Sequence, residues 1–133
     1  MRYDLELIFQ LCRELGLSAR ITDERVELDL GQGAVLCFQN AERKEDCLIG
    51  FLDTAWHTHG DLMFCDACGN CIELDYLDLL SGLKEGRVLV CEREVEGRTD
   101  DRWLIHSEYN DAFKYLDEGE RIIIRRAATL SLP

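Results

Sequence analysis

Two histidines and three cysteines lie within sixteen residues, in the segment WHTHGDLMFCDACGNC at positions 56–71. Thiolate sulfur and imidazole nitrogen are preferred donors for tetrahedral zinc in proteins. Three thiolates need a fourth donor, and a histidine just upstream reaches them if the chain folds back over the cysteines. The sequence therefore predicts a structural zinc site in residues 57–71, and the candidate ligands are Cys65, Cys68, Cys71, His59 and His57.

A hairpin is predicted to position the cysteines. The apolar runs LMF before Cys65 and IELDY after Cys71 are typical of two strands, and DACGN is a five-residue connection between them. Cys65 and Cys71 then face one another, while Cys68 projects from the connection and Gly69 supplies a left-handed conformation. The pattern Cys65-x-x-Cys68-Gly69 resembles the zinc knuckle of zinc-ribbon and zinc-finger families. That resemblance implies turn amides that point at the thiolates.

Three alternatives to this zinc site, and one alternative fourth ligand within it, remain open. The cysteines can be empty, reduced thiols in a turn rich in small residues. An iron–sulfur cluster is disfavoured because Ile72, Glu73, Leu74 and Asp75 follow Cys71, without the fourth cysteine and proline of a ferredoxin run. A disulfide between Cys65 and Cys71 is geometrically possible. Finally, Cys91 is a further candidate for the fourth ligand, although its run VLVCE favours burial in a strand.

The histidines also raise the question of catalysis. The triplet at His57 to His59 resembles the JAMM metalloprotease pattern, which implies a hydrolytic zinc held with a serine and an aspartate further along. Ala67 and Asn70 stand at those two positions, so the chemical residues of that family are missing. The chain also lacks a glycine-rich phosphate loop and a G-x-S-x-G motif. A non-catalytic protein is expected, with a metal-dependent hydrolase using His57 and His59 as an alternative.

The charge balance indicates what the protein binds. Twenty-seven acidic and fifteen basic residues give a net charge of -12, which repels nucleic acids and anionic membrane surfaces. The same field speeds encounter with a basic protein partner. In size and charge the chain is similar to bacterial immunity proteins that block nuclease toxins. This resemblance implies a second hypothesis, an acidic protein-binding inhibitor of a basic partner.

The N-terminal run MRYDLELIFQLCRELGL is interrupted by charges and is not typical of a signal peptide or membrane span. A cytoplasmic location is therefore expected. In that compartment the seven cysteines are expected to be reduced thiols or metal ligands rather than a disulfide framework.

The elements that must hold these residues point to a single α+β domain over residues 1–133. Apolar residues at helical spacing predict an N-terminal helix that ends near Gly16, and Asp75 and Gly86 bound a second helix. Tyr109 and the residues after it predict a third short helix, capped by Ser107. The remaining runs alternate or are β-rich, and short connections favour antiparallel pairing. We expect an antiparallel sheet of about six to eight strands, an N-terminal helix and two further short helices.

Overall fold

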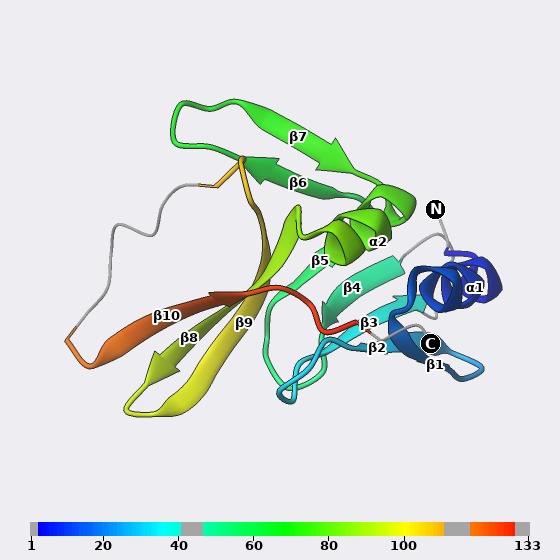
Figure 1. The fold of residues 1–133 in the computed structure, drawn as a ribbon, viewed down its shortest axis with the longest axis horizontal. Coiled ribbons are helices and arrows are strands. Elements are labelled where there is room, and N and C mark those ends of the chain that lie inside the picture. The colour runs from blue at the N-terminus through cyan, green and yellow to red at the C-terminus, as the bar shows by residue number, and fades with distance from the viewer. Residues whose placement is uncertain (1–2, 41–46, 111–117, 130–133) are drawn as a thin grey trace.

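The computed structural model describes residues 3–40, 47–110 and 118–129, and these form an α+β fold with three antiparallel sheets (Figure 1). The elements in chain order are α1 (Leu5–Leu15), β1 (Ser18–Ile21), β2 (Arg25–Asp29), β3 (Val35–Asn40), β4 (Cys47–Phe51), β5 (His57–His59), β6 (Leu62–Cys65), β7 (Cys71–Leu74), α2 (Tyr76–Glu85), β8 (Val88–Val95), β9 (Arg98–His106) and β10 (Glu120–Arg125).

Both helices end at the glycines that the sequence identifies, Gly16 and Gly86, and α2 also begins after the predicted Asp75. The side chain of Asp4 accepts a hydrogen bond from Leu7 N at 3.1 Å, and Gly16 closes α1 in the left-handed conformation. The side chain of Asp75 accepts from Asp78 N at 2.8 Å at the start of α2. The predictions of the first two helices are therefore confirmed. Among the described residues, no helix has the length and apolar character needed to cross a membrane.

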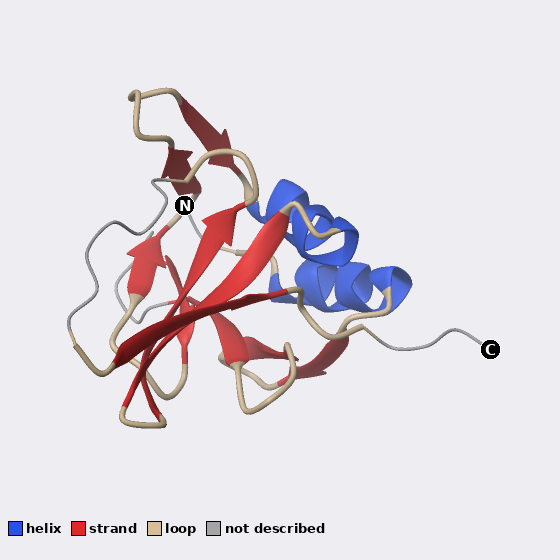
Figure 2. Ribbon diagram, turned by 60° about the vertical axis from the view of Figure 1, so that its left-hand side comes forward, coloured by secondary structure: helices blue, strands red, loops and turns tan. Residues whose placement is uncertain are grey.

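The first five strands form one sheet in the order β1-β2-β3-β4-β5. Val26 and Leu28 of β2 are fully buried, and they point toward the same side as Leu36 and Phe38 of β3. Helix α1 packs on β1 and β2, while α2 packs against α1, β7 and β8. Figure 2 shows the two helices side by side on one side of the strands. We call the opposite face of the five-stranded sheet the open face.

A buried charged network joins the three-stranded sheet, in the order β10-β8-β9, to the five-stranded sheet. Glu92 of β8 accepts hydrogen bonds from Arg102 Nε at 2.8 Å and from Arg125 Nε at 2.9 Å. Arg125 also donates to the carbonyls of Leu30 and Gly31, at 2.8 and 2.7 Å. Arg102 pairs with Asp53, just beyond β4. These contacts fix how the two sheets meet.

The prediction of an antiparallel α+β fold is confirmed, but one sheet with six to eight strands is wrong, because the described residues form ten strands in sheets of five, three and two. Strands β6 and β7 leave the first sheet after Gly60, which turns the chain with a φ of 72°. Residues 111–117, where most of the third helix is predicted, lie outside the described residues. Residues 107–110 are described and are not helical.

Candidate functional site

The predicted hairpin around the cysteines is confirmed as β6 and β7. Cys65 lies opposite Cys71 and Met63 lies opposite Glu73, and all four side chains are exposed. The alternate residues Leu62, Phe64 and Leu74 are buried and seat the hairpin on the body. The period of two along each strand therefore places the sulfur atoms of Cys65 and Cys71 on the outer face.

The structure joins Cys65 and Cys71 in a disulfide, with their Cα atoms 4.1 Å apart. This disulfide is one of the alternatives to the predicted zinc site, and the expected cytoplasmic compartment disfavours it. Cys68, at the turn, is an exposed free thiol. The sequence predicts that these three sulfur atoms bind one metal ion. In the structure, two of them form a disulfide and the third is a free thiol.

Asp66 organises the turn between the two strands. Its Oδ1 atom accepts hydrogen bonds from Cys68 N and Asn70 N, both at 2.9 Å, and its own amide donates to Asn70 O at 2.9 Å. The bonds from Asn70, and then those from Cys68 and Gly69, hold the pKa of the Asp66 carboxyl below its usual range. Asp66 is not among the residues predicted from the sequence to form the site. Its signal is an aspartate at the start of a turn with glycine three residues later.

The two histidines lie on another sheet. His57 and His59 belong to β5, where they pair with Gly50 and Leu48 of β4, and their rings are 5.4 Å apart. Atom Nδ1 of His57 lies 3.0 Å from Ala55 O and donates to that carbonyl when it carries the ring proton. Figure 1 shows the turn end of the β6–β7 hairpin lying away from β5. The structure therefore does not bring the histidines to the cysteines.

Within the described ranges, no group of three or more His, Cys, Asp or Glu side chains is arranged to hold a metal ion. Cys91, the alternative fourth ligand, is buried in β8 opposite Trp103, as its sequence favours. Burial raises its pKa to about 12, and Glu92 and Asp101 act in the same direction. The Cys91 thiol thus stays protonated near neutral pH and is held within a sheet.

On the open face, the cross-strand register places Cys37, Gly50 and His57 in one row. They line a shallow hollow of about 180 Å³. Burial raises the pKa of the Cys37 thiol to about 11, with Glu27 acting in the same direction and Arg25 against it. A thiol that is protonated at neutral pH is a poor nucleophile. The row therefore lacks the activated thiolate that a cysteine–histidine catalytic pair requires.

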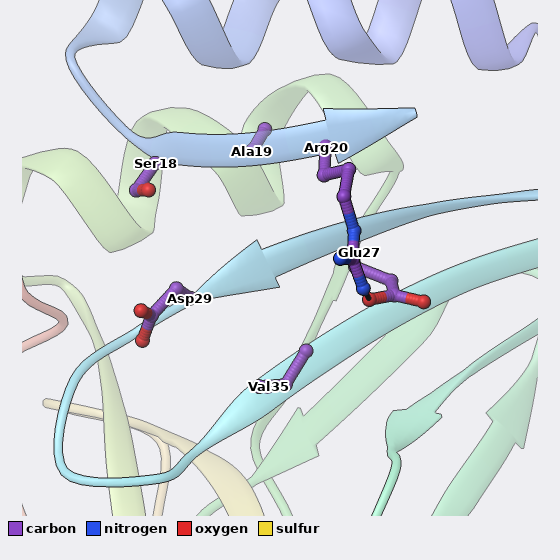
Figure 3. Close-up of a pocket in the computed structure, with 6 residues that line it drawn as sticks. All are labelled: Ser18, Ala19, Arg20, Glu27, Asp29 and Val35. Atoms are coloured by element: carbon purple, nitrogen blue, oxygen red, sulfur yellow. Dashed lines mark hydrogen bonds and ion pairs between the residues drawn. The ribbon is translucent and has the colours of Figure 1, made fainter. Parts of the chain in front are cut away.

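The same row continues at the other edge of the open face as an ion pair. Arg20 and Glu27 point toward each other in a second hollow (Figure 3). Arg25 Nε also donates to Glu27 at 2.7 Å. The hydrogen bond from Arg20, followed by that from Arg25, lowers the pKa of Glu27 against the opposing effect of burial. Both oxygens of Glu27 are therefore occupied by neighbouring arginines.

Basic residues are absent from one long part of the chain. Residues 45–83 contain eight acidic residues and no lysine or arginine. Their described part, 47–83, builds β4 to β7 and most of α2. Three of its carboxylates, those of Glu73, Asp75 and Asp78, are exposed and form no ion pair with any residue that the structure describes. The apolar side chains of Met63 and Leu77 are 61% and 41% exposed. We call this the hairpin–helix surface, defined by Met63, Glu73, Asp75, Leu77 and Asp78.

Comparison of the chain with known protein families, with curated protein sequences and with solved structures finds no significant match.

Proposed function

We propose that this chain is an acidic protein-binding module that receives a basic protein partner on the hairpin–helix surface. The observation that carries the proposal is the segregation of charge in residues 45–83, where eight acidic residues occur with no lysine or arginine among them. Like-charged side chains with no internal partner attract cations from outside the chain. A partner with clustered lysines and arginines supplies them.

The apolar side chains of the surface favour a protein over a small cation. Met63 stands opposite Glu73 on the hairpin, and Leu77 stands beside Asp78 on the first turn of α2. Figure 1 shows β7 leading directly into α2. The four residues of the surface on and between these two elements therefore lie within six consecutive positions, 73–78. Flexible methionine and exposed leucine are suited to packing against a partner's apolar groups, while acidic neighbours pair with its basic rim.

Such a contact would also let the module inhibit a basic partner. A protein whose natural ligand is a polyanion presents a basic surface to that ligand. The hairpin–helix surface offers carboxylates to the same basic groups and competes for them. The partner class is therefore a basic protein, and a partner that acts on nucleic acid would be blocked by occupation of its binding surface.

The test is a nuclear magnetic resonance titration with a short peptide rich in lysine and leucine. We expect amide shifts concentrated at Met63, Glu73 and residues 75–78. Replacing Glu73→Gln together with Asp78→Asn should weaken binding about fivefold at low salt, which corresponds to about 1 kcal/mol for two exposed charge pairs. Asp75 is left intact because it caps α2.

The matched control removes the same charge elsewhere. Asp23→Asn with Glu24→Gln neutralises two exposed carboxylates in the turn between β1 and β2. Unchanged binding by this control, with weakened binding by the first variant, supports a specific surface. Equal weakening by both variants, or shifts spread over all acidic residues, would show that only net charge acts and would contradict the proposal.

A further inference from the structure

We propose that reduction of the Cys65–Cys71 disulfide by a dithiol converts the turn of the hairpin into a three-thiolate site for one thiophilic metal cation, such as zinc. Cys65, Cys68 and Cys71 supply three sulfur donors within seven residues, and all three are exposed. Thiolates favour zinc and copper(I) over harder cations. The oxidised hairpin lacks the site because two of its three donors are bonded to each other.

The dithiol supplies both electrons and both hydrogens that reduction of the disulfide requires. One thiolate of the dithiol attacks the sulfur of Cys65 or Cys71, the S–S bond breaks, and the other cysteine leaves as a thiolate. The second thiol of the reductant then displaces the first cysteine from the mixed disulfide. The reductant ends as a disulfide, and its two hydrogens end on Cys65 and Cys71. Metal binding then releases the thiol protons to solvent.

The backbone that presents the three sulfurs does not depend on the disulfide. Backbone pairing of β6 with β7 and the hydrogen bonds of Asp66 close the turn independently. Burial of Leu62, Phe64 and Leu74 holds the hairpin on the body. After reduction, Cys65 and Cys71 therefore remain opposite one another, with Cα atoms close enough for both sulfurs to bind one ion. Cys68 lies midway between them in sequence, beside the left-handed Gly69.

The fourth position of this site is open to solvent. His57 and His59 are held on β5 by pairing with β4, on a different sheet from the cysteines. Zinc with three protein ligands and one exchangeable position is an established coordination type. The proposed ligands are therefore the three predicted cysteines, without either of the predicted histidines.

The experiment uses cobalt(II) as an optical probe that zinc displaces. The full chain is reduced with dithiothreitol, the reductant is removed without oxygen, and thiolate-to-cobalt absorption is followed during titration. We expect one cobalt per reduced chain, none for the oxidised chain, and loss of the absorption on addition of zinc. Cys68→Ser should weaken cobalt binding by more than about tenfold, since even loss of an outer-shell group costs that much.

Two control variants make the outcome specific. Cys37→Ala removes a thiol from the five-stranded sheet. The double variant His57→Ala with His59→Ala removes both imidazoles. Neither control should change cobalt binding. Circular dichroism checks that each reduced variant keeps the fold. The inference is overturned if the reduced wild type binds no cobalt, if Cys68→Ser binds as tightly as wild type, or if the histidine variant loses the metal.

Discussion

His106 is a buried imidazole whose surroundings require it to be neutral. Its Nδ1 atom accepts hydrogen bonds from the amides of Glu108 and Tyr109, at 3.1 and 3.3 Å, so the ring proton of the neutral form is on Nε2. The rings of Phe64 and Tyr109 lie 5.9 and 5.2 Å from it. Burial lowers the pKa of His106 below 6.5, Arg87 acts in the same direction, and Glu108 opposes them.

This lowered pKa predicts a pH dependence of stability. Below pH 6.5 the unfolded chain takes up a proton on His106 that the folded chain resists, so protonation favours unfolding. The free energy of unfolding from urea titration should therefore fall as the pH is lowered from about 7.5 to about 5.5, toward the folded pKa. His106→Gln removes the titrating group and should flatten this dependence. An equal slope in both proteins would contradict the assignment.

At the scale of elements, the joint between the two larger sheets depends on Glu92. This carboxylate is 6% exposed and lies between two guanidinium groups, those of Arg102 on β9 and Arg125 on β10. Arg125 also binds carbonyls beyond β2, so β8, β9, β10 and the five-stranded sheet meet in one network. Burial followed by the nearby charge of Arg125 lowers the pKa of Arg102. Glu92 is therefore the common partner of two guanidinium groups, while Asp53 is a second partner of Arg102 alone.

Glu92→Gln should destabilise the fold by about 3 kcal/mol, because it leaves two largely buried guanidinium groups without their common partner. Glu94→Gln is the matched control on the same strand. Glu94 pairs with Arg121, which is 71% exposed, so its loss should cost less than about 1 kcal/mol. Urea unfolding at neutral pH measures both. Equal losses for the two variants would show that the buried network has no special role.

Elements could be predicted from the sequence where their signals are local. Gly16 ends α1, and Asp75 and Gly86 bound α2, by contacts within a few residues. The cysteine hairpin follows from two apolar runs and a short connection. The grouping of strands into sheets could not be predicted, because it depends on contacts between distant segments. Strand β5 joins β4 across Gly50, where an added Cβ would lie 2.9 Å from His57 Cβ. Glycine inside a strand was the only local signal of that close approach.

In the candidate site, too, local features could be predicted from the sequence and long-range ones could not. Register placed Cys65 opposite Cys71, and that much follows from the sequence. Whether facing cysteines share a metal or a disulfide depends on redox conditions, which no residue pattern records. The position of His57 depends on which strand pairs with β4, a long-range property. The sequence therefore predicted the facing pair Cys65 and Cys71, whereas the expected approach of His57 or His59 to the cysteines is not seen in the structure.

At the scale of the whole molecule, positive and negative charges are unevenly distributed along the fold. Most arginines with ion pairs lie on β1, β2 and the three-stranded sheet, while residues 45–83 carry carboxylates alone. With a net charge of -12, repulsion between unbalanced carboxylates opposes compact folding. Exposed ion pairs contribute little in return, since each provides less than about 1 kcal/mol. Repulsion therefore dominates the response of this molecule to salt.

Raising sodium chloride from about 20 to about 300 mM should increase the melting temperature, because added ions shorten the range of the repulsion between carboxylates. An increase of about 2–4 °C corresponds to about 1 kcal/mol in a chain of this size. At low salt, Glu73→Gln should raise the melting temperature by removing one unbalanced negative charge, whereas Arg98→Gln should lower it by removing an exposed positive one. Calorimetry at both salt concentrations measures these shifts. A melting temperature that falls with salt, or two variants that shift it in the same direction, would mean that ion pairs outweigh the net charge.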